Sequence, residues 1–292
     1  MYFCFCKNIR IMKRFLFTLA VLAFAVPSWA FKVYIFADME GATGITCRPQ
    51  VLNGEGAARM EEDINVCIAA CFEAGATQVV VRDGHSSGCN VDPAKIDPRA
   101  ELIQGPTPYE RFRNISGSEA IIFLGYHAMS LTPNAILAHT YSSLSVQARY
   151  LNGREVGEIG IDASIAAEHN VPVVLVQGAD DACREAREWI PGVVTCQSKK
   201  SLTTQSGKCL SPEKSHRLLA RKTKEALSRR HKIALLSPEY PAVIRTELVA
   251  EGSVRTFDPA YVRNPDPEIV EATSLDSVEE ALLGRPTASD QL

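Results

Sequence analysis

Two carboxylates stand close together at the end of an apolar run. The run Phe31–Ala37 reads FKVYIFA, and Asp38 and Glu40 follow it directly, before Gly41. We expect this segment to be extended, so that the two carboxylates, two residues apart, point the same way. Two like charges at the end of a buried strand repel each other and lose hydration. A group of opposite charge nearby would offset both costs. The stretch therefore predicts a cation, or a cluster of basic side chains, next to these carboxylates.

Histidines follow other apolar runs in the same way. Three of the six histidines stand in or just after such runs: His85, His127 and His139. The other three fall in helical or basic stretches: His169, His216 and His231. Carboxylates and imidazoles together are the N/O ligand set that suits zinc or a similar divalent metal. The sequence thus favours a metal site that carries both types of ligand.

The segments around these residues predict the elements that must position them. We expect strands at 31–37, 78–82, 101–105, 119–125, 135–140, 145–151, 171–178 and 192–197. We expect helices at 57–72, 157–169, 180–189 and 211–228. Alternating strands and helices are typical of βαβ units, which have parallel strands and right-handed crossovers. Ligands bind such sheets beyond the carboxyl ends of the strands, where the acidic residues and histidines would meet.

The predicted fold is α/β, with a mostly parallel sheet, flanking helices and a ligand site at the carboxyl edge. We expect three regions: a signal peptide at 1–30, a metal-binding catalytic core at 31–200, and a smaller C-terminal α+β region at 201–292. Strands near 242–249 and 268–272 flank a stretch rich in Pro, Asp and Gly in the last region.

A third carboxylate, Glu158, lies between Gly157 and Gly160 at the start of a predicted helix. With it the candidate ligands number five: Asp38, Glu40, His85, His127 and Glu158. Small neighbours allow a backbone to come close to a site. Five ligands are too many for one tetrahedral zinc with an open position. They suit two metals about 3.5–4 Å apart that share a bridging carboxylate. Taken singly, each candidate also has an ordinary structural explanation, such as a loop cap, a turn residue at Asp83, or a helix-dipole charge at Glu158.

The first thirty residues predict an export signal. A basic segment up to Arg14 precedes an apolar run of twelve residues, Phe15–Val26, and small residues precede a cleavage point after Ala30. Such a run is shorter than the roughly 20 residues of a membrane span. We therefore expect an exported, periplasmic protein without a stable membrane span after cleavage.

Composition excludes some classes of function and leaves others open. The net charge of −3 and the absence of a basic stripe with interleaved aromatic residues argue against nucleic-acid binding. Seven of the nine cysteines lie beyond residue 30, and none of them forms a CxxC pattern typical of zinc. Cys67 and Cys71 are one helical turn apart on an apolar face, which predicts buried thiols.

Six short motifs make the chain resemble the DppA-like zinc D-aminopeptidases. In chain order they are ADMEG, RDGHS, LGYHA, AHT, VGEIG and KCLSP. The resemblance covers about Val33 to Leu227, and the motifs are specific as a set. Beyond Pro238 the likeness is faint.

The resemblance implies a residue assignment and an activity. It implies that Asp38 bridges two zinc ions, that Glu40 and His127 complete one site, and that His85 and Glu158 complete the other. It implies that His139 is the catalytic histidine.

The implied activity is removal of N-terminal D-residues from short peptides of the D-Ala-D-Ala type, by a hydroxide that two zinc ions activate. The family also implies a homo-oligomer, namely a decamer. An export signal is a departure from the family, whose best-known member looks cytoplasmic.

The residues leave two alternatives open. The first is another two-metal hydrolase, either an L-peptidase or a phosphoesterase. The second is a protein that binds D-peptides without turnover. Assays with D-Ala-D-Ala, L-Ala-L-Ala and p-nitrophenyl phosphate would separate these hypotheses.

Overall fold

The computed structural model of the chain describes residues 31–107 and 110–284. The predicted signal peptide at 1–30 and the last eight residues lie outside the described residues. The described residues form one compact unit by their internal contacts. No helix in the described ranges is long and apolar enough to cross a bilayer.

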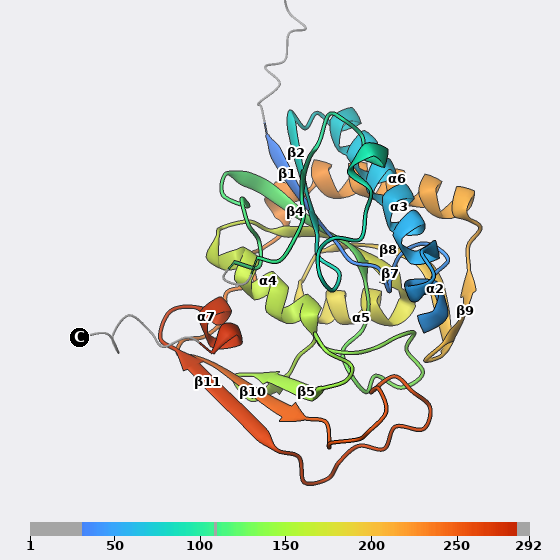
Figure 1. Cartoon of the computed structure of the whole chain (residues 1–292). Coiled ribbons are helices and arrows are strands. Elements are labelled where there is room, and N and C mark those ends of the chain that lie inside the picture. Colours follow the sequence, from blue (N-terminus) through green and yellow to red (C-terminus); the bar gives the residue numbers. More distant parts are fainter. Residues whose placement is uncertain (1–30, 108–109, 285–292) are drawn as a thin grey trace, which may run out of the picture. The chain divides into compact units, whose positions relative to one another are not determined.

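The larger sheet lies at the centre of this unit (Figure 1). Within the described residues it has seven strands in the order β3-β2-β1-β4-β7-β8-β9. Their bounds are β1 Lys32–Ala37, β2 Gln78–Asp83, β3 Glu101–Ile103, β4 Ser118–Tyr126, β7 Val173–Ala179, β8 Val194–Thr203 and β9 Ser206–Cys209. The pairs are parallel except for β8 with β9. The predicted mostly parallel α/β sheet is confirmed.

Helices cover both faces of this sheet. The covering helices are α3 Glu55–Glu73, α4 Glu158–Glu168, α5 Asp180–Trp189 and α6 Pro212–Ser228. The short helix α2 Arg48–Leu52 packs on α3, and α7 Val278–Leu283 packs on α4 and on a second, smaller sheet. α3 packs on α6, whereas α4 packs on α5. Because both faces are covered, the central strands are buried almost along their whole length, as parallel strands require.

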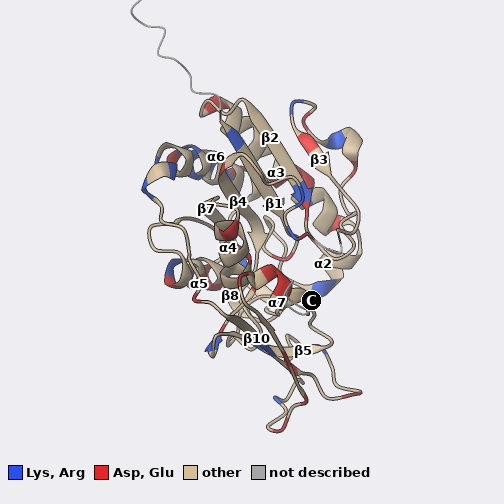
Figure 2. Ribbon diagram, turned by 90° about the vertical axis from the view of Figure 1, so that its left-hand side faces the viewer, with Lys and Arg blue, Asp and Glu red and all other residues tan. Residues whose placement is uncertain are grey.

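Helix ends follow the sequence signals. Gly75, just after α3, has a φ of 95°, a backbone conformation that glycine adopts without steric cost. The side chain of Ser211 accepts a hydrogen bond from the backbone N–H of Lys214 at the start of α6. Basic residues gather along the outer side of α6, while elsewhere both signs are interspersed (Figure 2).

A second, smaller sheet holds four strands among the described residues, in the order β11-β10-β5-β6. The strands are β5 Val146–Leu151, β6 Arg154–Glu155, β10 Ala242–Leu248 and β11 Ile269–Ser274. All its pairs are antiparallel, and the predicted Asn152-Gly153 turn joins β5 to β6. The smaller region is therefore present, and it combines strands from both sides of residue 200.

Two local predictions are wrong. The segment 135–140 is not a strand: it is part of a chain of turns in which Asn134 and Leu137 have φ values of 57° and 50°. Its apolar side chains are buried instead against the loop after β1, where Ile136 and Leu137 cluster with Ala42, Ile45 and Phe257.

The second error concerns the segment of Asp38 and Glu40, which we expected to be extended. β1 ends at Ala37, and the chain turns at residues 39–43. The cysteine prediction is confirmed for Cys67 and Cys71, which are buried free thiols.

Candidate metal centre and active site

The loop that carries Asp38 and Glu40 lies directly on the end of β4. The backbone N–H of Asp38 donates to Leu124 O at 2.7 Å, and that of Gly41 donates to Gly125 O at 2.6 Å. Gly125 has a φ of 73°, and a Cβ on it would collide with the carbonyl of Asp38. Glycine at 125 therefore allows the two segments to approach, which places the carboxylates beside the residues that follow β4.

His85 lies on the loop after β2, which Asp83 shapes. Asp83 is fully buried and accepts a hydrogen bond from Asn90 Nδ2 at 2.8 Å, and the same amide donates to His85 O at 2.6 Å. This loop directs His85 Nδ1 to within 3.0 Å of Asp38 Oδ1 and 3.1 Å of Glu40 Oε2. Asp83 is thus the last residue of β2 and holds the loop that follows. Both carboxylates meet at one imidazole despite the turn between them.

His127 and Glu158 meet on the other side of Asp38. Glu158 is the first residue of α4, and a Cβ on the preceding Gly157 would collide with Glu185 and Met129. The helix can therefore begin right against the segment after β4. His127 Nε2 lies 3.3 Å from Glu158 Oε1 and 3.5 Å from Asp38 Oδ2.

His139 lies on the turns that follow β4 and stacks on His127. The two ring centroids are 4.0 Å apart and the ring planes differ by 12°. His139 Nδ1 lies 2.9 Å from Leu137 O, a carbonyl that can only accept, so Nδ1 carries a proton. Nε2 is then unprotonated in the neutral ring, and it lies 3.8 Å from Glu158 Oε1.

The cluster is buried, so its charges act strongly on one another. Burial lowers the pKa of His127, but Glu158 and Asp38 outweigh it and raise that pKa to about 10. Burial also lowers the pKa of His85, but Glu40 and Asp38 outweigh it and raise that pKa to about 11. Burial and the charge of Glu40 raise the pKa of Asp38 to about 6. The carboxylates thus strongly stabilise positive charge at this place.

Two further observations indicate that these residues could bind metal cations. Glu40 Oε2 and His127 Nε2 are buried and make no well-aligned hydrogen bond among the described residues, although a group of the cluster lies within 3.3 Å of each. Two groups of three residues bring their ligand atoms within 4.8 Å of one another: Asp38, Glu40 and His127, and His127, His139 and Glu158. Carboxylate and imidazole donors at this spacing match the ligands that zinc takes.

The group of Asp38, Glu40 and His127 is one of the two sites that the resemblance implies, whereas the shortest contacts follow a different division. His85 contacts Asp38 and Glu40, not Glu158. His127 contacts Asp38 and Glu158 at shorter range than the 4.8 Å within which it meets Glu40. Asp38 touches both histidines, which is the geometry of a carboxylate between two sites.

The sequence did not point to the residues that hold Glu158. Arg111 donates to both oxygens of the buried Asp162 at 2.9 Å, and its Nη2 lies 3.4 Å from Glu158 Oε2. The backbone N–H of Tyr141 donates to Glu158 Oε1 at 2.7 Å. Asp162 is one helical turn after Glu158, so the i, i+4 spacing in the predicted helix was a usable signal.

Lys199 was also missed. Its ammonium is buried in β8 and donates at 2.8 Å to Glu40 O and to Ala42 O, and it also donates to Ile45 O. These three hydrogen bonds fix the loop after β1. A lysine at the end of a strand has no pattern that distinguishes it from a solvated lysine, so the sequence carried no signal.

The cluster opens into a cavity of about 430 Å³. Five of the six predicted site residues line it: Asp38, Glu40, His85, His139 and Glu158. His127 lies behind them, in contact with Glu158. The cavity is large enough for a small-molecule or short-peptide ligand.

Comparison with known proteins identifies the family. The family model described as D-aminopeptidase, peptidase M55, matches residues 31–274. The chain belongs to this family. It is 37% identical over 179 residues to a D-aminopeptidase of Bacillus subtilis (strain 168), a match that covers 59% of this chain and 65% of the relative.

The fold is also shared with a solved member of the D-aminopeptidase family. The structure of the Zn-dependent D-aminopeptidase DppA from Bacillus subtilis, a self-compartmentalizing protease, matches with a TM-score of 0.77 at 34% identity. The match covers 87% of this chain and 95% of the DppA chain.

Proposed function

We propose that this protein is a zinc-dependent D-aminopeptidase that removes N-terminal D-residues from short peptides such as D-Ala-D-Ala. The observation that carries the proposal is the meeting of acidic residues and histidines from three strand ends and one helix start in a single cavity. Membership of the D-aminopeptidase family supports it.

The donor set supports two zinc ions for each chain. Asp38 would be shared between them, Glu40 and His85 would help to hold one, and His127 and Glu158 would help to hold the other; the close contacts of these side chains support this assignment. Zinc bound there would supply Lewis-acid polarisation of the scissile carbonyl and a nucleophilic water at neutral pH.

His139 would act as the base that takes a proton from the attacking water and later gives it to the leaving amine. Its Nδ1–H is held by Leu137 O, which leaves Nε2 facing the cluster as a base. Burial and the neighbouring His127 lower the pKa of His139, so the ring is neutral and ready to accept a proton at pH 7. It can then return that proton to the leaving amine as the peptide bond breaks.

The remaining residues hold this arrangement in place. Arg111 and Tyr141 fix the two oxygens of Glu158, and Lys199 fixes the backbone of Glu40. Positioned groups of this kind need no reorganisation during the reaction.

A substrate panel tests the proposal. The purified protein with zinc should hydrolyse D-Ala-D-Ala and leave L-Ala-L-Ala and p-nitrophenyl phosphate nearly untouched. Faster cleavage of the L-dipeptide or of the phosphate ester would instead establish another two-metal hydrolase. Binding of D-Ala-D-Ala without turnover would establish a peptide-binding protein.

The proposal also includes the cellular compartment in which the enzyme acts. The export signal at residues 1–30 leads us to place the enzyme in the periplasm, and the family match that begins at residue 31 supports cleavage after Ala30. N-terminal sequencing of the protein from a periplasmic fraction should begin at Phe31. Recovery of the intact chain from the cytoplasm would contradict this localisation.

Assembly into a homo-oligomer, namely a decamer, is the last part of the proposal. β11 is an edge strand whose Ile269 and Val270 are 46% and 50% exposed, and Val262 nearby in sequence is 81% exposed. Exposed apolar edges are usually covered in the native assembly. Analytical ultracentrifugation should give the mass of ten chains, whereas a monomer would contradict the assembly.

A further inference from the structure

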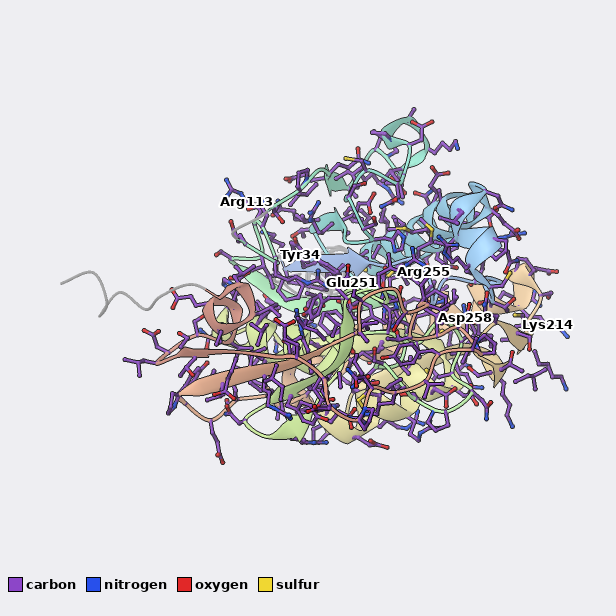
Figure 3. The ribbon with its side chains drawn as sticks, turned by 60° about the horizontal axis from the view of Figure 1, so that its bottom comes forward. Tyr34, Arg113, Lys214, Glu251, Arg255 and Asp258 are labelled. Atoms are coloured by element: carbon purple, nitrogen blue, oxygen red, sulfur yellow. The ribbon has the colours of Figure 1, made fainter. Side chains whose placement is uncertain are left out.

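Two arginines line the cavity without a part in the machinery described above. Arg48 is the first residue of α2, and Arg255 lies on the connection between β10 and β11 (Figure 3). Both line the cavity into which Asp38, Glu40 and Glu158 project. Segments far apart in the sequence thus place two cations at one cavity.

Neither arginine has an acidic partner within the described ranges. No carboxylate oxygen of residues 31–107 or 110–284 lies within 4.0 Å of either guanidinium, although Asp258 borders the adjoining cavity with both. Arg255 Nη1 donates to Ser143 Oγ at 2.8 Å. Burial and the charge of Arg48 both lower the pKa of Arg255. The two guanidinium groups therefore repel each other electrostatically.

The third arginine at this cavity differs from these two. Arg111 is neutralised by Asp162 and Glu158, at 2.9 Å and 3.4 Å. Its charge is therefore satisfied within the protein. The charges of Arg48 and Arg255 remain free for a ligand.

The cavity is consequently bipolar. Its lining carries both the carboxylates of the candidate metal centre and the two unpaired guanidinium groups. Apolar side chains share the lining, including Leu52, Leu137 and Phe257. A short peptide has the complementary form, with a free amine at one end, a carboxylate at the other, and apolar side chains between them.

We propose that Arg48 and Arg255 bind the α-carboxylate of the peptide substrate and so select short peptides with a free C-terminus. Guanidinium groups bind carboxylates with strong, directional hydrogen bonds. The inference rests on the proposed function, because it assumes that the cavity holds a peptide whose amine lies at the metal centre.

The test compares two substrates that differ only at that carboxylate. D-Ala-D-Ala and D-alanyl-D-alaninamide are assayed with the wild type, R48Q, R255Q and the double variant. Loss of charged hydrogen bonds predicts that kcat/KM for D-Ala-D-Ala falls roughly 10- to 100-fold, mainly through KM. The amide should be hydrolysed at nearly unchanged kcat/KM, and R48K and R255K should retain part of the preference.

R217Q is the matched control, because Arg217 is an exposed arginine on α6 that pairs with Glu213. It should leave the kinetics of both substrates unchanged. Equal losses for the acid and the amide in the double variant would overturn the carboxylate role and indicate a structural one. Equal kcat/KM for both substrates in the wild type would overturn it too. If the wild type hydrolyses neither substrate, the proposed function itself fails, and the inference fails with it.

Discussion

His139 differs from His85 and His127 in how far its ring nitrogens lie from the carboxylates of the cluster. Nδ1 is fixed by the backbone carbonyl of Leu137, whereas Nε2 lies 3.8 Å from the nearest oxygen of Glu158. His85 and His127, by contrast, each lie within 3.5 Å of two carboxylates. A base must be free to exchange its proton, so this difference favours His139 as the proton carrier.

Replacing His139 with alanine should therefore abolish proton transfer and spare the metal centre. We expect turnover of D-Ala-D-Ala to fall roughly 10²- to 10⁴-fold, the usual contribution of a general acid–base group. Elemental analysis should still find the zinc content of the wild type. The control is H231A, which removes an exposed histidine. Full turnover by H139A would show that the proton carrier is another residue.

At the scale of single residues, the sequence indicated which side chains form the site, but it did not indicate which side chains hold them in place. Asp38, Glu40, His85 and His127 were recognisable because each follows a buried strand of a parallel sheet. Arg111 and Lys199 were not, because their roles depend on hydrogen bonds to groups far away in the sequence, such as the 2.8 Å bond from Lys199 to Glu40 O. Arg48 and Arg255 are further cases of the same kind.

At the scale of elements, the approach between the β1 loop and the end of β4 depends on glycine. Gly125 and Gly117 have nearly the same φ, 73° and 76°, but a Cβ would collide with Asp38 O at 125 and meet nothing within 4 Å at 117. These two positions separate the cost of backbone strain from the cost of the collision.

We predict that Gly125→Ala destabilises the protein more than Gly117→Ala. Both substitutions incur the strain of a positive φ, of order 1 kcal/mol. Only Gly125→Ala adds overpacking, typically 1–3 kcal/mol. Urea denaturation would measure the difference in the free energy of unfolding. Equal values would show that the β1 loop moves away from β4 without cost.

The helix α5 contributes a buried carboxyl group to the same region. Glu185 Oε2 accepts a hydrogen bond from Met129 N at 2.8 Å, and Oε1 has no partner among the described residues. Burial raises the pKa of Glu185 from about 4.5 to about 7. Between these values the folded protein binds a proton that the unfolded chain has released, so stability falls as the pH rises.

The E185Q variant should therefore show a flatter dependence of stability on pH. From pH 5 to pH 7 the wild type should lose roughly 2 kcal/mol more than this variant in the free energy of unfolding. The exposed Glu188 on the same helix supplies the control, E188Q. Parallel pH profiles for wild type and E185Q would refute the raised pKa.

Most elements were predictable, because strands and helices with a clear period also carry clear end signals. Segment 135–140 misled the prediction because its apolar run resembles a buried strand. The structure buries those side chains against Ala42 and Phe257 without any strand pairing. Apolar composition indicates burial, and only the partner strand decides whether a buried segment is extended.

At the scale of the whole molecule, the strand order explains why the candidate metal-binding residues lie together at one edge of the sheet. The chain builds β2 and β3 on one side of β1 and then β4, β7 and β8 on the other. The crossovers therefore diverge between β1 and β4, which leaves a crevice at their carboxyl ends. Asp38 and His127 lie at this point. The sequence predicted the carboxyl edge of an α/β sheet as the site, and the strand order that locates the crevice comes from the structure.

The smaller sheet was less predictable from the sequence. β10 pairs with β5 although about ninety residues separate them. No feature of either strand's sequence identifies the strand with which it pairs. The connection between β10 and β11 brings Arg255 and Phe257 to the cavity. The C-terminal region thus contributes to the site, which the sequence analysis did not foresee.

Zinc content is the most direct measurement of the central claim, that distant acidic and imidazole side chains hold two cations. Elemental analysis of the purified wild type should find two zinc ions per chain, and H85A and E158A should each retain about one. Two zinc ions in both variants, or none in a wild type that still hydrolyses D-Ala-D-Ala, would contradict the account.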